Sequence, residues 1–390
     1  MDLKRLDRLE EILDSAISGN SIAGGSVAVI KNGQTIYRTD RGFADIENGI
    51  KMGSDTIFRL FSLSKPITSA AAMILFERGK LDIEYPLKWF IPEFDKPSVS
   101  DNGWIVNRER DITIRDLLNM TSGIPYPDQS YHAGKLMDDV FNQVQKDNAE
   151  GNFVDTQEYA RRAATVPLAF QPGDRWAYGF SADILGAVIE KIADKKYSEF
   201  LKDEIFNPLG MVDTDFYVPE EKLSRFAQMY DYNTPDGMPK IFEYIFLGVG
   251  NYDKKPAFES GGAGLVSTVS DYGRFATMLA NGGTLNGVKI LGRKTVDFMS
   301  QNQLTDHQKR TYQWDSCKGY GYGNLMRILE NPSAFGTNGS AGEFGWDGWA
   351  GDYCSIDRKE NLVFELFIQK CGGDLNLTRR LRSVVYSAVE

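Results

Sequence analysis

Segments that favour β-strands lie near both ends of this 390-residue chain, and segments that favour helices lie between them. Near the start, β-rich runs at 26–30 and 34–39 flank Asn32-Gly33, a pair typical of a tight hairpin turn. Further strands and a closing helix are expected near the end, at 319–329, 341–357, 361–370 and 375–390. Strands joined by short turns pair antiparallel. We therefore expect an antiparallel sheet that both ends of the chain build together.

The middle of the chain is expected to be mainly helical. The run 64–77 is apolar nearly all round and predicts a buried helix, and Pro66 fits its first turn, where no N–H is needed. We predict an α/β (α+β) fold with a sheet domain of residues 1–66 and 291–390 and a mostly helical inserted domain of residues 67–290. A cleft between two such parts is the usual place for a small-molecule site.

Composition excludes several classes of function. The chain has 44 Lys and Arg against 54 Asp and Glu, a net charge of −10, and no basic cluster, so binding to nucleic acid or to an anionic membrane is not expected. No apolar run reaches the about 20 residues of a membrane helix. The charged start lacks the apolar core of a signal peptide, and the three scattered cysteines suggest reduced thiols, so a cytoplasmic location is expected. The same start predicts a helix packed on the surface of the protein by one apolar face, made of Leu3, Leu6, Leu9, Leu13 and Ile17.

Metal and nucleotide chemistry also find no support in the sequence. Only His132 and His307 are present, both in polar, loop-like stretches, and no HExxH or CxxC motif occurs. The glycine patterns of dinucleotide-binding and P-loop proteins are missing as well. We expect no metal and no organic cofactor.

Ser62-Leu63-Ser64-Lys65 is the only Ser-x-x-Lys in the chain, and it lies at the start of the predicted buried helix. This spacing puts both side chains on one face of a helical turn. A serine hydroxyl needs a neighbouring base to become a nucleophile, and a lysine whose pKa is lowered by desolvation can be that base. The alternative is that Ser62 is an ordinary N-cap and Lys65 a surface charge. The tetrapeptide alone favours this alternative.

Longer segments reverse that preference. The run around Ser62 and the segments 112–125, 170–190, 257–283 and 345–357 resemble, in this order, the motifs of the penicillin-recognising serine hydrolases. These are the class C β-lactamases, the DD-peptidases and the family VIII carboxylesterases. The resemblance spans nearly the whole chain and implies the β-lactamase/transpeptidase-like fold, with the active site in the cleft between its two parts.

The resemblance implies a role for each matching residue. Ser62 would be the acylated nucleophile and Lys65 its proton acceptor. Tyr178 would be a second base that passes the proton to the leaving group and later activates water, with the Lys65 ammonium favouring its phenolate form. The backbone N–H groups of Ser62 and Trp349 would form the oxyanion hole. Core packing is the alternative for Tyr178, but Trp176 and the Pro-Gly turn before it favour the catalytic interpretation. For Trp346 and Trp349, core packing is equally plausible and does not exclude lining of the pocket.

Departures from the family's motifs bear on the substrate. Phe180 stands where the β-lactamases and DD-peptidases usually have Asn, and Trp346 stands where they have Lys. The second exchange removes a cation that would pair with a substrate carboxylate. Trp346 and Gly348 form a Trp-x-Gly similar to that of family VIII carboxylesterases, so we expect both, with Phe180, to bind the substrate. Tyr126 is expected to line the entrance. Asp183 is interpreted as a helix-start residue rather than a catalytic one.

A loop at 230–262 supports an apolar pocket for the acyl or alcohol group, unless its rings only pack the inserted domain. Its aromatic residues are Tyr230, Tyr232, Phe242, Tyr244, Phe246, Tyr252 and Phe258. We expect a serine hydrolase that cleaves small carboxylic esters. Alternatives on the same fold are a β-lactamase, a D-amino-acid peptidase or an acyltransferase, and an alternative of another class is a non-catalytic binding protein. The substrate would be a small ester or amide; the oligomeric state is left open.

Overall fold

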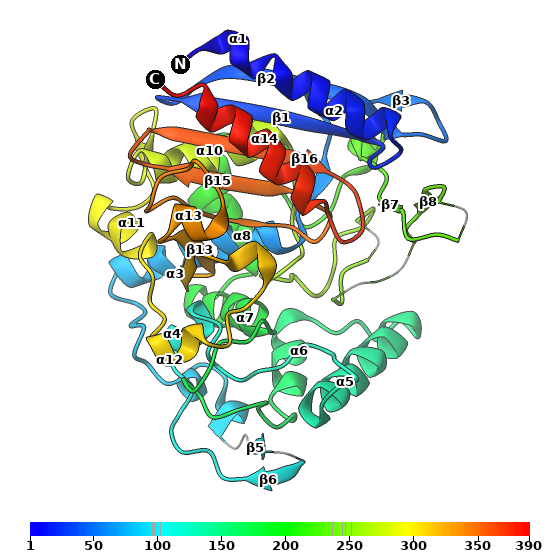
Figure 1. Ribbon diagram of the computed structural model, residues 1–390. Coiled ribbons are helices and arrows are strands. Elements are labelled where there is room, and N and C mark those ends of the chain that lie inside the picture. Colours follow the sequence, from blue (N-terminus) through cyan, green and yellow to red (C-terminus); the bar gives the residue numbers. More distant parts are fainter. Residues whose placement is uncertain (96–97, 102, 236, 244, 246, 251) are drawn as a thin grey trace.

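The computed structural model describes residues 1–390 except 96, 97, 102, 236, 244, 246 and 251. An eight-stranded antiparallel sheet forms its upper part in Figure 1. The spatial order of its strands is β12 (Tyr320–Gly323), β13 (Met326–Leu329), β14 (Phe344–Asp347), β15 (Tyr353–Asp357), β16 (Leu362–Ile368), β1 (Gly24–Lys31), β2 (Gln34–Asp45) and β3 (Ile50–Lys51). The pairing of β1 with β16 joins the two ends of the chain, as predicted.

The turns of the sheet match the sequence only in part. Asn32 and Gly33 connect β1 to β2 with φ angles of 53° and 76°, which confirms the predicted hairpin. The expected single strand at 319–329 is wrong, because Asn324 and Leu325 turn the chain with φ angles of 49° and 59° and divide it into β12 and β13. The segment 341–357 divides in the same way into β14 and β15.

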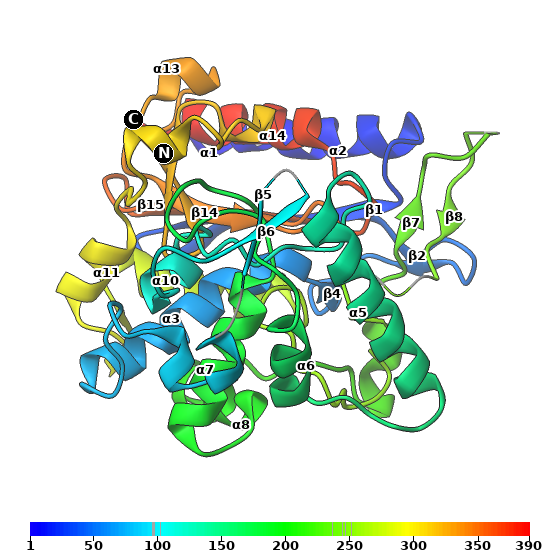
Figure 2. The same cartoon turned by 90° about the horizontal axis from the view of Figure 1, so that it is seen from below.

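Helices from the two ends cover one face of the sheet (Figures 1 and 2). They are α1 (Leu3–Leu6), α2 (Arg8–Ser18) and α14 (Leu375–Ser387). The expected N-terminal helix is thus broken at Asp7. Leu6, Leu9 and Leu13 are buried against the sheet, whereas Leu3, expected on the same buried face, is 52% exposed.

The other face of the sheet packs on α3 (Lys65–Glu77) and α10 (Val269–Ala280). Because side chains alternate along a strand, Val27 and Val29 of β1 face the terminal helices, while Ala28 and Ile30 face these two. Helix α3 has Pro66 in its first turn and is buried from Lys65 to Leu75, as the sequence predicted.

The remaining elements lie below this layer or at its margins (Figure 1). The helices are α4 (Ile114–Leu118), α5 (His132–Ala149), α6 (Thr156–Ala163), α7 (Ser181–Ala193), α8 (Tyr197–Leu201), α9 (Asn207–Leu209), α11 (Arg293–Met299), α12 (Asp306–Lys309) and α13 (Pro332–Phe335). The paired strands are β4 (Phe58–Arg59) with β9 (Val266–Ser267), β5 (Val99–Asp101) with β6 (Trp104–Val106), β7 (Tyr230–Asp231) with β8 (Lys240–Ile241), and β10 (Thr284–Leu285) with β11 (Val288–Lys289). Among the described residues, every helix is too short or too polar to cross a bilayer. The division into two domains stays a prediction.

Candidate active site

Ser62 lies in a short 3-10 helix, η1 (Phe61–Ser64), that runs directly into α3. Phe61, the residue that precedes Ser62 in the chain, has a φ of 42°, a conformation that is costly for a residue with a Cβ atom. The turn is held from the side of β9, because Leu60 N–H donates to the carbonyl of Leu265 and Leu265 N–H donates to Ser64 Oγ. The fold therefore fixes the backbone on both sides of the serine.

Lys65 places its amine on the Ser62 hydroxyl. The Nζ–Oγ distance is 3.1 Å, and the amine also donates to the carbonyl of Gly262 at 2.8 Å. Lys65 is fully buried, and desolvation lowers the pKa of its amine to about 7, although Asp183 and Asp347 act in the opposite direction. A lysine with this pKa is half deprotonated near neutrality and can accept the serine proton.

Tyr178 lies beside the serine, and the Ser62 hydroxyl acts to lower the pKa of its phenol. The Lys65 amine is 4.5 Å from the centre of the Tyr178 ring. Burial raises the pKa of Tyr178, so the phenol stays protonated at neutral pH, in contrast to the phenolate expected from the sequence. The indole N–H of Trp346 donates to the Tyr178 oxygen at 3.0 Å, and the two rings stack. Trp346 is itself buried.

Tyr126 completes the ring of groups around the lysine. Its hydroxyl is 3.5 Å from Lys65 Nζ. Burial raises the pKa of Tyr126, and the negative charge of Asp183 acts in the same direction. Tyr126 was expected at the entrance of the pocket, but it contacts the amine directly.

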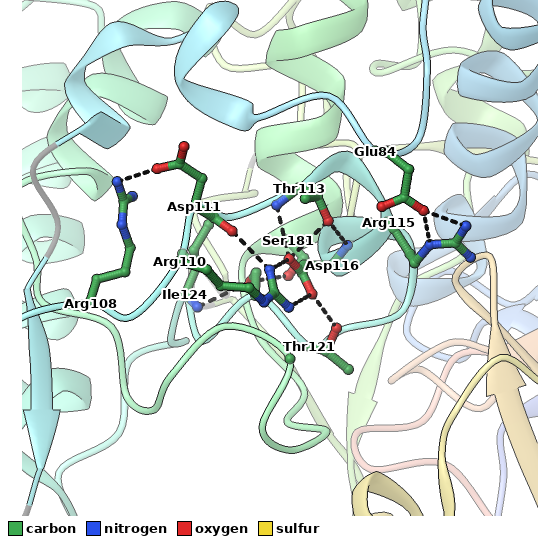
Figure 3. A network of polar contacts seen from close by, with 12 residues as sticks. Glu84, Arg108, Arg110, Asp111, Thr113, Arg115, Asp116, Thr121, Ile124 and Ser181 are labelled. Carbon is green, nitrogen blue, oxygen red and sulfur yellow. Dashed lines mark hydrogen bonds and ion pairs between the residues drawn. The ribbon is translucent and has the colours of Figure 1, made fainter.

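A polar network beneath α7 holds the loop that carries Tyr126 (Figure 3). The buried Asp116 accepts a hydrogen bond of 3.0 Å from the Thr121 hydroxyl. The hydroxyls of Ser122 and Ser181 are 2.8 Å apart and join the loop to the first residue of α7. These contacts fix the loop to both α4 and α7, and so fix the position of Tyr126 beside the lysine.

Asp183 is the residue of this site that the sequence interpretation missed. It is the third residue of α7, as expected of a helix-start residue, but its buried carboxylate does not cap the helix. It accepts hydrogen bonds from the Ser260 hydroxyl and from Gly262 N–H. A Cβ atom on Gly262 would lie 2.5 Å from the Asp183 carboxylate, so this approach requires glycine. In the sequence, the Gly261-Gly262 pair was the signal that could have indicated such a close approach.

Gly348 and Trp349 follow β14 and lie against the turn that carries Ser62. A Cβ atom on Gly348 would be 2.4 Å from the carbonyl oxygen of Leu60, so only glycine allows the two backbones to come this close. The Trp349 ring packs edge-on against Phe61, with ring centres 5.4 Å apart. The backbone after β14 is therefore beside the backbone that precedes Ser62.

Phe180 and the aromatic loop lie further from the serine. Phe180 is buried behind Tyr126, at 6.2 Å between ring centres, and it packs among other aromatic rings. Phe242 reaches Trp349, with ring centres 5.2 Å apart. A cavity of about 290 Å³ beside Phe61 is lined by Phe61, Phe226, Met229, Phe242, Val249 and Tyr252. Two rings of the loop, Tyr244 and Phe246, lie outside the described residues.

Comparisons with known proteins find relatives over nearly the whole chain. A family model described as Beta-lactamase matches residues 9–385. Esterase EstB of Burkholderia gladioli is 30% identical over 401 residues, which cover 97% of this chain and 95% of EstB. Protein Rv1367c of Mycobacterium tuberculosis is 31% identical over 374 residues, which cover 93% of this chain and 88% of that protein.

A similar solved structure is that of EstCE1, described as a hydrolase with promiscuous acyltransferase activity. The match covers 98% of this chain and 99% of the EstCE1 chain, with a TM-score of 0.82 and 24% identity. This likeness and the antiparallel sheet flanked by helices confirm the predicted fold. The chain belongs to the Beta-lactamase family.

Proposed function

We propose that this member of the family hydrolyses small carboxylic esters through an acyl-enzyme on Ser62. The observation that carries the proposal is the 3.1 Å contact between Lys65 Nζ and Ser62 Oγ, made by an amine whose pKa is about 7. A buried lysine of this kind can work as a general base without histidine.

The reaction has two halves. In the first, the Lys65 amine takes the Ser62 proton while Oγ attacks the ester carbonyl, and the bond to the alcohol then breaks. The alcohol leaves with a proton from the Tyr178 phenol, which recovers one from the Lys65 ammonium. In the second half, water attacks the acyl group, gives its proton to the same groups, and frees Ser62. The N–H groups of Ser62 and Trp349 would bind the oxyanion, a contribution of about 10²–10³ in rate for each such donor.

Several features support an ester over a β-lactam or a peptide. Trp346 replaces the cation that would pair with a substrate carboxylate, and it binds Tyr178 instead. The cavity beside Phe61 has aromatic and aliphatic side chains that suit an apolar acyl or alcohol group, although Arg59, Glu243 and Asp253 also line it. Esterase EstB is a relative over nearly the whole chain. A cytoplasmic location stays a prediction.

The test is the Ser62→Ala variant with p-nitrophenyl butyrate. We expect turnover to be abolished while circular dichroism shows the fold retained. Fluorophosphonate labelling with mass mapping should place the label on Ser62. Normal turnover in the variant would end the proposal, and a chain that takes no label would be a non-catalytic binding protein. Faster hydrolysis of nitrocefin than of the ester would favour a β-lactamase.

A further inference from the structure

A buried carboxyl group without a partner lies on the sheet face that packs against α10. Glu365 of β16 is fully buried, and among the described residues neither of its carboxylate oxygens has a hydrogen-bond partner. Its neighbours across the sheet are Cys354 on β15 and Ala28 on β1, and Arg38 on β2 follows Ala28. The proposed mechanism does not use Glu365.

A cavity of about 290 Å³ opens beside this carboxyl group. Two small residues, Ala28 and Gly273, leave space for this cavity. Ala28 leaves space between Glu365 and Arg38, and a Cβ atom on Gly273 of α10 would lie 3.0 Å from a Glu365 oxygen. Its apolar walls come from Ala28, Ile30, Val269 and Leu285. Thr35, Ser270, Thr277 and Asn286 add polar groups to the lining, and Arg38 and Arg274 reach it as well. The cavity thus combines aliphatic and polar side chains with one buried acid.

Arg38 acts to lower the pKa of Glu365, but it makes no hydrogen bond to the carboxyl group. Arg38 is held by both carboxylate oxygens of Asp40, at 3.1 Å each, and by the Ser270 hydroxyl at 2.7 Å. Arg274 is exposed and lines the cavity, and it makes no ion pair with any residue that the structure describes. The other titratable groups near Glu365 are the Cys354 thiol and the Tyr272 phenol, whose hydroxyl donates to the carbonyl of Leu63.

A buried carboxylate is costly unless a cation pairs with it. We propose that this cavity binds a small aliphatic compound with a primary ammonium group, which pairs with the Glu365 carboxylate while its carbon chain lies along the aliphatic walls. Burial raises the pKa of Glu365, which favours the neutral acid before the ligand binds. The ammonium keeps its proton on binding and Glu365 loses its own, so each ligand bound releases one proton to solvent.

The test is isothermal titration calorimetry of the full chain with n-butylammonium chloride. We expect saturable binding and about one proton released, measured from the dependence of the enthalpy on the ionisation enthalpy of the buffer. Glu365→Gln should weaken binding at least tenfold and abolish the proton release. Glu11→Gln, which removes an exposed carboxylate from α2, should leave both unchanged. The proton count is measured on the unmodified chain, so the test remains valid if the Glu365 variant does not fold.

Further probes separate this site from the serine and identify the ligand. Ser62→Ala should bind butylammonium normally, whereas Gly273→Ala should weaken binding by filling the cavity. Butan-1-ol and butyrate, which lack the ammonium, should not bind. Tighter binding of 4-aminobutyrate that depends on Arg274 would identify an amino acid as the ligand. Absence of butylammonium binding, equal binding of butyrate, or loss of binding in Ser62→Ala would overturn the proposal.

Discussion

The indole N–H of Trp346 donates a 3.0 Å hydrogen bond to the hydroxyl oxygen of Tyr178, whose pKa the Ser62 hydroxyl acts to lower. The indole thereby fixes the orientation of the phenol beside Ser62. Trp346 comes from β14 of the sheet, and Tyr178 comes from the segment just before α7. The contact therefore links the sheet to the helical part of the molecule at the reacting atoms.

Trp346→Phe tests this link. Phenylalanine keeps an aromatic ring against Tyr178 but removes the N–H donor, and a lost hydrogen bond of this kind costs about 1 kcal/mol. We expect kcat for p-nitrophenyl butyrate to fall about tenfold with little change in KM. Trp89→Phe is the matched control, because this side chain is 62% exposed, and it should leave kcat and KM unchanged. An unchanged kcat in Trp346→Phe would show that the indole does not position the phenol.

Lys65→Ala and Tyr178→Phe test the proton path. Each variant should lose most of the rate, because the amine and the phenol serve the same proton transfers. For the same reason, the double variant should lose little more than the worse single variant. Steady-state kinetics of the three variants measure this coupling. If the rate losses of the two single variants multiplied in the double variant, the two side chains would act independently.

Gly348→Ala tests the backbone arrangement after β14. The added methyl group would meet the Leu60 carbonyl oxygen at 2.4 Å and push the backbone at 348–349 away from the nucleophile turn. We expect kcat to fall about 10²–10³-fold, the range for loss of an oxyanion donor. Gly53→Ala is a suitable control, since its new Cβ would meet nothing closer than 3.4 Å. Equal activity of the two variants would contradict a role for this backbone.

Lys65→Met tests the cost of burying the amine. A shift of the lysine pKa from 10.5 to about 7 costs ~5 kcal/mol at about 1.4 kcal/mol per unit. In the variant the Gly262 carbonyl would lose its hydrogen-bond donor, and this loss offsets the gain by about 1–3 kcal/mol. The variant should therefore be inactive but more stable at pH 7 by about 2–4 kcal/mol, as measured by urea unfolding.

The stability difference between Lys65→Met and the unmodified protein should depend on pH. The lowered pKa makes the folded state bind fewer protons than the unfolded state between pH 7 and 10.5. The penalty is complete below pH 7 and disappears as the pH rises toward 10.5, so the stability advantage of Lys65→Met should shrink over that window. A constant difference between the two proteins would mean that the amine is not desolvated.

Local signals in the sequence predicted much of the fold. Asn32-Gly33 specifies a tight turn by itself, and the apolar run of α3 can only be buried. The Asn324-Leu325 turn was missed because leucine at a positive φ has no sequence signal; this conformation is imposed by the pairing of β12 with β13. Leu3 was expected to be buried because its spacing matches Leu6 and Leu9, but it is the first residue of the short helix α1 and is exposed.

The candidate site shows the same division between local and distant information. Ser62 and Lys65 share one helical turn, so their contact follows from their spacing. The contacts of Asp183 could not be predicted in this way, since Ser260 and Gly262 are more than seventy residues away along the chain. Its position in the first turn of a helix matched an ordinary helix start, and only the fold shows that the carboxylate faces the lysine site.

The protonation state of Lys65 tests the account most directly. Lysines labelled with ¹³C at Cε can be followed by NMR through a pH titration, with the Lys65 signal assigned by its absence in Lys65→Ala. We predict a midpoint at about pH 7 for this residue, and a rise in kcat/KM with pH through the same value. A Lys65 midpoint near 10.5, where unperturbed lysines titrate, would contradict a neutral amine acting on Ser62.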